Sequence, residues 1–212
     1  MIKQKVLNHG SDYFYRVHLS KLNTLCNYES LKNYLASIFR YCPDEHFNSG
    51  PRSSSLRFKL KNLNILHTEN HEISSLTQFA LNGNEERNAH DDVEFFLLRN
   101  DNKTIAVEIP IWLKPEELID YETLFGTSKV LSGHIDILRI EDDKVWIWDY
   151  KPNARSEKYA DTQTFFYALM LSKRTGIDLE NFRCGYFDSN NTYIFKPQLS
   201  AIIKNKVISE FL

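Results

Sequence analysis

The chain has 212 residues, of which 42% are hydrophobic and 25% are charged, and its net charge is −2. This length suits one substantial globular domain, and the composition excludes a disordered chain and a protein coated in positive charge, such as a histone-like protein. An enzyme that acts on nucleic acid is not excluded, because an acidic active site needs only a local basic rim.

Two further classes of protein are disfavoured. No run approaches the roughly 18 consecutive apolar residues of a membrane-spanning helix, and the N-terminus lacks the apolar segment of a secretory signal, so we expect an intracellular protein with no membrane partner. Cys26, Cys42 and Cys184 are odd in number and far apart, which indicates neither a disulfide framework nor a Cys-x-x-Cys metal pair. We expect these thiols to be reduced and mainly to pack.

The first part of the chain is expected to form helices and loops. Apolar residues between 22 and 41 recur at mixed three- and four-residue spacings, which predicts one or two helices. Residues 46–55 combine Asn, Ser, Gly and Pro without apolar periodicity, which predicts a mobile loop with basic residues in it and after it. We therefore expect residues 1–83 to be an N-terminal region of helices and loops, packed within one compact domain on a core of residues 84–212.

The core begins with a helix and three strands. From Asn84 to Asn100, apolar residues form one stripe behind an acidic first turn, which predicts a helix. Residues 104–113, 130–140 and 144–151 are rich in β-branched or alternating apolar residues, which predicts strands, the last two paired as a hairpin.

The remainder of the core is expected to return across the sheet. Residues 157–175 have helical apolar spacing and end at Gly176, a residue that commonly ends helices. Residues 182–188 and 192–197 predict two short strands, and residues 199–212 a helix-like end. The order of elements predicts an α/β fold in which a central mixed β-sheet is flanked by helices on both faces.

Three charged residues in the predicted hairpin stand out. Side chains alternate along a strand, so Asp149 and Lys151 share a face while Tyr150 points the other way. Asp136 lies on the neighbouring strand, where a second carboxylate can approach Asp149. Mg²⁺ or Mn²⁺ between the two aspartates would relieve their repulsion, and Lys151 would orient or help deprotonate a metal-bound water. The alternative is a solvent-facing Asp136 beside a surface charge pair, which is the more frequent situation for an isolated Asp-x-Lys.

Together with the next helix, these residues resemble a known family. Gly133 with Asp136, then Asp149-Tyr150-Lys151, then Gln163 with Tyr167, are similar in order and spacing to the PD-(D/E)XK nuclease superfamily and its RecB-like branch, which includes nucleases associated with CRISPR adaptation. The resemblance implies a restriction-endonuclease-like core. It also implies metal binding by Asp136 and Asp149, catalysis by Lys151, and support of the site or the DNA by Gln163 and Tyr167.

Two more residues are candidate metal ligands. RecB-like proteins carry a histidine on an upstream helix, and the resemblance assigns this role to His90, one helical turn before Glu94. The alternative is that both lie on a solvated helix face. Glu108 is an acid within an apolar strand, and it either extends the acidic cluster or lies at an exposed edge. CRISPR-associated relatives commonly hold an iron–sulfur cluster with four cysteines, and we expect none here because the three cysteines are unclustered.

The function expected from these residues is Mg²⁺- or Mn²⁺-dependent cleavage of DNA. Alternatives are a Holliday-junction-resolving endonuclease, which would act as a homodimer, and a non-catalytic nucleic-acid-binding protein that keeps the fold. The short chain, without a P-loop motif, is similar to small standalone nucleases of archaeal viruses, including spindle-shaped viruses. Basic residues that would contact DNA phosphates are Arg52, Arg57, Lys59, Arg155 and Lys158.

Overall fold

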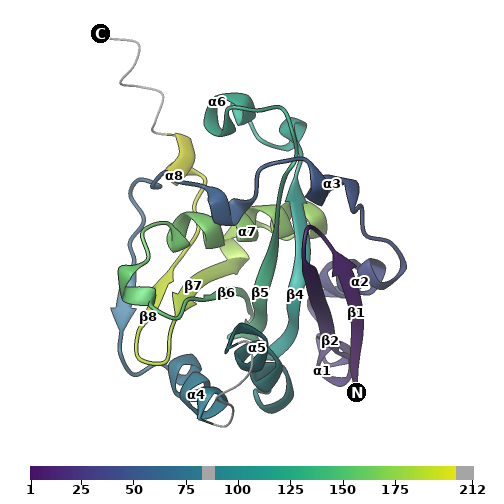
Figure 1. Ribbon diagram of the computed structural model, residues 1–212, viewed down its shortest axis with the longest axis vertical. Helices are drawn as coiled ribbons and strands as arrows, with labels where there is room; N and C mark the ends of the chain where they lie inside the picture. The colour runs from purple at the N-terminus through teal and green to yellow at the C-terminus, as the bar shows by residue number, and fades with distance from the viewer. Residues whose placement is uncertain (83–88, 204–212) are drawn as a thin grey trace.

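An eight-stranded sheet forms the centre of the protein in the computed structural model, which describes residues 1–82 and 89–203 (Figure 1). In chain order the strands are β1 (Ile2–Asn8), β2 (Asp12–His18), β3 (Leu66–Thr68), β4 (Thr104–Leu113), β5 (Leu131–Glu141), β6 (Lys144–Tyr150), β7 (Phe182–Phe187) and β8 (Thr192–Phe195). Their order in the sheet is β1-β2-β4-β5-β6-β7-β8-β3. The β6–β7 pair is parallel and the other pairs are antiparallel, so the expected mixed sheet is confirmed.

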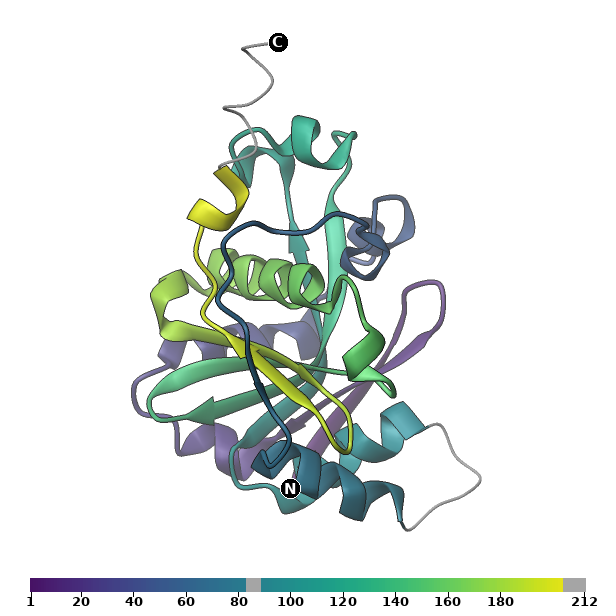
Figure 2. The same ribbon diagram turned by 90° about the vertical axis from the view of Figure 1, so that its left-hand side faces the viewer.

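Helices cover both faces of this sheet. The larger ones are α2 (Glu29–Arg40), α4 (Glu72–Leu81), α5 (Ala89–Asn100) and α7 (Ala160–Thr175). Short helices are α1 (Leu19–Asn23), α3 (Glu45–Asn48), α6 (Tyr121–Phe125) and α8 (Ser200–Ile203), with single 3₁₀ turns η1 (Ser53–Ser55), η2 (Pro115–Glu117), η3 (Ala154–Ser156) and η4 (Leu179–Asn181). Figure 2 shows α7, the green helix, separated by strands from α4 and α5 at the bottom of the view. The expected α/β architecture with helices on both faces is therefore confirmed.

Two apolar cores lie on the two faces. The larger core joins α2 and α7 to residues of β4 and β5 such as Ile109 and Ile135. The smaller core joins α4 and α5 to Val107 and Ile137 on the same two strands. On β4, Val107 packs in the smaller core and Ile109 in the larger one, and Glu108 lies between them. On β5, Asp136 lies in the same way between Ile135 and Ile137. Glu108 has a φ of +51°, a left-handed backbone conformation that interrupts the strand alternation at this point.

The N-terminal region differs from the expected helices and loops. Residues 1–83 contribute β1, β2 and β3 to the sheet, and β2 pairs with β4 through Arg16↔Val107 and Val17↔Ala106. Tyr15 and Val17 are buried, as expected of a strand with one inner face. The prediction missed the hairpin because β1 exposes most of its side chains and therefore lacks a strong apolar pattern.

The segment expected to be a loop at residues 46–55 contains part of α3 and all of η1. It is attached to β5, because Ser132 donates its backbone N–H to Pro51 and Ser53 donates its hydroxyl to the Ser132 carbonyl, at 3.0 and 2.9 Å. Ser53 is consequently buried. This attachment brings Arg52 and Ser54 beside the strand that carries Asp136.

Other sequence expectations agree with the structure. α7 ends at Gly176, whose φ of +72° is the left-handed conformation expected of a helix-ending glycine. Asp161 lies in its first turn and Lys173 in its last, where each complements the helix dipole. The parts of two predicted helices at residues 84–88 and 204–212 lie outside the described residues. Within the described ranges, we find no helix with the length and apolar character needed to cross a membrane.

Gly133 allows η1 and α7 to pack against β5. A Cβ atom at this position would lie 2.4 Å from Ser53 Oγ and 2.6 Å from Tyr167 Cε1. Gly133→Ala should therefore lower the free energy of unfolding by about 1–3 kcal/mol, the usual cost of overpacking. Urea unfolding measures this difference. A variant as stable as the unmodified chain would show that Ser53 and Tyr167 move aside without cost.

Candidate active site

Asp149 in β6 and Lys151, the first residue after β6, lie on one face, as strand alternation predicts. Lys151 Nζ lies 2.6 Å from Asp149 Oδ2, and the Asp149 side chain is fully buried. Tyr150, between them, packs on the other side in the smaller core. The pair is therefore internal, and the alternative of a surface charge pair is wrong for these residues.

Asp136 joins three elements of the fold. Its Oδ2 accepts a hydrogen bond from the Tyr150 backbone N–H at 3.0 Å and lies 2.9 Å from His90 Nε2. The first contact fixes Asp136 to β6, and the second fixes it to α5. Asp136 is 7% exposed, so the alternative of a solvent-facing strand residue is also wrong.

Helix α5 directs both His90 and Glu94 toward Asp136. A ligand atom from each of these three residues lies within 4.8 Å of the other two, a spacing that suits binding to one metal ion. Glu94 is 1% exposed, and within the described residues its Oε1 has no hydrogen-bond partner. The helix is held by an ion pair of 2.6 Å between Asp91 and Arg16 of the N-terminal hairpin. Asp91 therefore anchors the helix, while the other two residues face the site.

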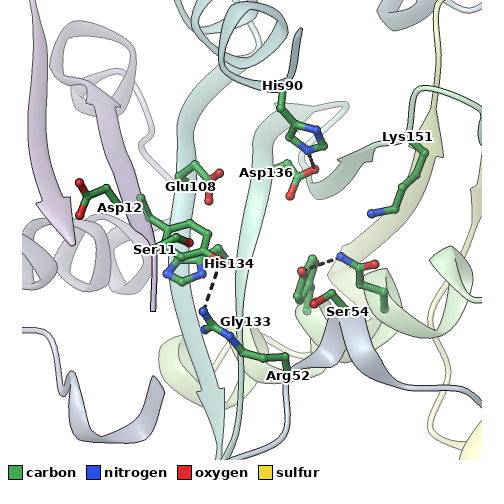
Figure 3. Close-up of a pocket in the computed structure, with 13 residues that line it drawn as sticks. Ser11, Asp12, Arg52, Ser54, His90, Glu108, Gly133, His134, Asp136 and Lys151 are labelled. Carbon is green, nitrogen blue, oxygen red and sulfur yellow. Dashed lines mark hydrogen bonds and ion pairs between the residues drawn. The ribbon is translucent and has the colours of Figure 1, made fainter. Parts of the chain in front are cut away.

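Glu108 extends the acidic cluster from β4. Figure 3 shows Glu108 and Asp136 on neighbouring strands, with Lys151 approaching from the other side of the cavity. Within the described part of the chain, the buried Oε2 of Glu108 has no hydrogen-bond partner. The left-handed backbone at Glu108 lets Ile109 return to the larger core. Such strained conformations concentrate at functional sites.

The carboxylates strongly affect one another's ionisation. Burial and the nearby Asp136 raise the pKa of Asp149 to about 7 and that of Glu108 to about 8. Burial and Glu108 raise the pKa of Glu94 well above its usual value. Burial also opposes ionisation of Asp136, but His90, Lys151 and the Tyr150 N–H outweigh it and lower the pKa of this carboxyl. The cluster cannot carry all its negative charges without added positive charge.

The basic groups supply part of that positive charge. Burial opposes protonation of His90, but Asp136 outweighs it and raises the pKa of the imidazole to about 9. Burial likewise opposes the charge on Lys151, and Asp149 and Asp136 outweigh it and raise the pKa of the ammonium group. Among the described residues, the buried Oε1 of Glu94 and Oε2 of Glu108 nevertheless have no hydrogen-bond partner. Such carboxylate oxygens are suitable ligands for a hard divalent cation.

Gln163 and Tyr167 lie one turn apart on the inner face of α7. The Gln163 side-chain amide donates hydrogen bonds to Asp149 Oδ1 at 2.8 Å and to the Tyr167 hydroxyl at 2.7 Å. Asp149 is thus oriented by Gln163 through one oxygen and by Lys151 through the other.

An open cavity of about 470 Å³ lies above Asp149 and is bordered by most of the other site residues. One wall combines the predicted Arg52 with two residues that the sequence interpretation did not include: Tyr13 from the hairpin, stacked at 3.7 Å on His134 of β5. Arg52 donates to the His9 carbonyl at 2.7 Å and to the Tyr13 hydroxyl at 3.2 Å. His134 stands two residues before Asp136 on the same strand. This spacing is the feature of the sequence that could have identified His134 as a residue near the site.

Only some of the predicted DNA-contacting residues border a cavity in the structure. Arg52 borders the first cavity, and Arg57 and Lys158 border a second of about 370 Å³. The two cavities share Ser54, Lys151 and Gln163. Lys59 and Arg155 are exposed and border neither cavity.

The fold and the site agree with a comparison of the sequence with known families. Residues 76–207 match the family model of the PD-(D/E)XK nuclease superfamily. The chain belongs to this superfamily. No curated protein matches it significantly. As a PD-(D/E)XK nuclease, it is expected to act on nucleic acid, and members of the superfamily typically use divalent metals.

The structure thus brings the predicted site residues of this PD-(D/E)XK nuclease together. Asp149 lies beneath the cavity, in contact with Lys151 and Gln163. The others border the cavity directly: His90, Glu108, Asp136, Lys151, Gln163 and Tyr167. Glu94, which the sequence places one helical turn after His90 so that both could face the site, lies within 4.8 Å of His90 and Asp136 but does not border the cavity.

The buried acids should make the metal-free protein less stable at high pH. The pKa of Glu108 is raised from 4.5 to about 8, so the folded state favours the protonated acid. Its contribution to stability is complete below pH 4.5 and is lost as the pH rises through about 8. Glu108→Gln mimics the protonated acid and should lose less stability over this range. Urea unfolding in EDTA at both ends of the range measures the difference.

The exposed Glu116→Gln provides a matched control and should retain the pH dependence of the unmodified chain. An equal loss of stability in Glu108→Gln and Glu116→Gln would contradict the assignment of a protonated, buried Glu108.

Proposed function

We propose that this protein is a divalent-metal-dependent deoxyribonuclease of the RecB-like branch. The observation that carries the proposal is that Asp136 and Lys151 meet at one open cavity, above a buried Asp149 that contacts Lys151 and is held by Gln163 from α7. The contact between His90 and Asp136 supports the RecB-like assignment. A surface that only binds a polyanion gains nothing from clustered, buried carboxylates, so catalysis is favoured over binding alone.

Asp136 and Asp149 are the proposed main metal ligands, with His90, Glu94 and Glu108 arranged around them. His90 would bind in its neutral form, after losing the proton that Asp136 stabilises. Mg²⁺ or Mn²⁺ bound there would supply charge neutralisation on the phosphate and a more acidic water.

Lys151 is proposed to act at the reacting phosphodiester. Its ammonium group borders both cavities and is kept charged by the aspartates. A cation fixed at this point stabilises the negative charge that develops on phosphate oxygens and positions the attacking water. Gln163 keeps Asp149 turned toward the lysine, and Tyr167 in turn fixes Gln163.

The two adjoining cavities suggest a path for one strand of DNA. Arg52 and Tyr13 border one side of Lys151, and Arg57 and Lys158 border the other. Guanidinium and ammonium groups bind phosphates, and an aromatic ring provides a stacking surface for a base. A strand that follows this path would place a phosphodiester bond next to Lys151.

Removing Lys151 should abolish most of the activity. With Mg²⁺ or Mn²⁺ and labelled single-stranded, duplex and four-way-junction DNA, Lys151→Ala should cleave roughly 10²- to 10³-fold more slowly, as when one charge-stabilising group is lost. Lys173→Ala, at the far end of α7 from Gln163, is the matched control and should retain full activity.

Cleavage that is equal in Lys151→Ala and Lys173→Ala would contradict the proposal. Binding without cleavage of any substrate would favour the non-catalytic alternative. Cuts restricted to symmetric positions of the junction, by a protein that is dimeric in gel filtration, would favour a resolving endonuclease.

The basic residues at the second cavity should control affinity rather than chemistry. Arg57→Ala and Lys158→Ala should each weaken binding of single-stranded DNA and reduce the slope of log affinity against log salt by about 0.7 for each phosphate that is no longer neutralised. The turnover rate at saturating DNA should change little. Fluorescence anisotropy across a salt series tests this, and slopes equal to that of Lys173→Ala would exclude an interaction with phosphate.

A further inference from the structure

A second cluster of metal-ligand side chains lies behind the cavity wall. His9 lies in the turn between β1 and β2, and Cys42 and Asp44 follow α2. One ligand atom from each residue lies within 4.8 Å of the other two. His9 and Cys42 are buried, at 2% and 7% exposure, whereas the Asp44 side chain is largely exposed.

We propose that His9, Cys42 and Asp44 form a binding site for Zn²⁺, separate from the proposed nuclease site. Imidazole, thiolate and carboxylate are the side-chain groups that bind zinc in proteins. The thiol would release its proton to solvent when it binds the ion. The thiolate and the carboxylate would then neutralise the charge of the ion.

The donor atoms already stand near the separations that zinc requires. His9 Nε2 lies 2.9 Å from Asp44 Oδ1 and 3.9 Å from Cys42 Sγ. Tetrahedral zinc, with bonds of about 2.0–2.3 Å, holds its ligand atoms about 3.3–3.8 Å apart. Small side-chain movements would therefore admit the ion, and the exposed side of Asp44 leaves the fourth position accessible to water.

His134 gives the His9 ring the orientation that a zinc ligand needs. His9 Nδ1 lies 2.9 Å from His134 Nε2, while the opposite nitrogen faces Cys42 and Asp44. The tautomer that donates from Nδ1 to His134 leaves the lone pair of Nε2 directed at the site. Histidine ligands of zinc commonly have such a partner on the second ring nitrogen.

The ligand types separate the two proposed sites chemically. The nuclease site offers carboxylates and one imidazole, which suit a hard ion such as Mg²⁺ or Mn²⁺. The second site includes a thiolate, which favours zinc over magnesium. Zinc there would tie the hairpin turn to the segment after α2. Phe47 on this segment already stacks on His9 at 3.8 Å.

The test uses the full chain, stripped of metal and titrated with Co²⁺, a spectroscopic substitute for Zn²⁺. We expect one equivalent to produce a sulfur-to-cobalt charge-transfer band, which added Zn²⁺ abolishes by displacement. The band should persist in Asp149→Asn, whose substitution lies in the proposed nuclease site. It should also persist in Cys26→Ser, the matched control at an exposed cysteine, and it should be absent in Cys42→Ser.

Three results would overturn the proposal: no sulfur band in the unmodified chain, a band that survives Cys42→Ser, or a band that disappears in Cys26→Ser. Circular dichroism checks that the variants fold. If Cys42→Ser does not fold, Asp44→Asn replaces it, because the exposed side chain tolerates substitution. Asp44→Asn should require more Co²⁺ to saturate the band, and an unchanged titration would also overturn the proposal.

Discussion

The repulsion between buried carboxylates is the constraint on which this structure depends. Asp136, Asp149 and Glu94 are buried on β5, β6 and α5, and the half-buried Glu108 approaches them from β4 at the border of the cavity. Such a cluster is stable only if some acids stay protonated or if positive charge is placed among them. His90 and Lys151 provide part of that charge, and the proposed cation would provide the rest. The same constraint makes the cluster costly for folding and useful for chemistry.

The surrounding fold holds the repelling groups in place. Arg16 of the N-terminal hairpin is paired with Asp91 and fixes α5, which carries His90 and Glu94. Gln163 of α7 holds Asp149 from the opposite face of the sheet. The left-handed backbone at Glu108 directs this acid into the cluster without removing Ile109 from the larger core. Elements that are far apart in sequence thus together position the carboxylate oxygens of the cluster.

The sequence predicted what depends on local geometry. Strand alternation placed Asp149 with Lys151, hairpin adjacency brought Asp136 near them, and helical spacing paired Gln163 with Tyr167. The pairing of the N-terminal hairpin with β4 was missed, because a register such as Arg16↔Val107 joins residues far apart in sequence. The positive φ of Glu108 occurs inside an otherwise extended strand, and no residue type in the sequence signals it. The meeting of His9 with Cys42 likewise depends on how the hairpin turn packs against the segment after α2.

The carboxylates around Asp136 are proposed to hold a divalent cation. Electron paramagnetic resonance of free Mn²⁺, titrated with the metal-stripped protein at neutral pH, tests this proposal most directly. Saturable Mn²⁺ binding is predicted for the unmodified chain and for Cys42→Ser. A large loss of Mn²⁺ binding is predicted for a folded Asp136→Asn variant. Equal Mn²⁺ binding by the unmodified chain and Asp136→Asn, or no binding by either, would contradict the account.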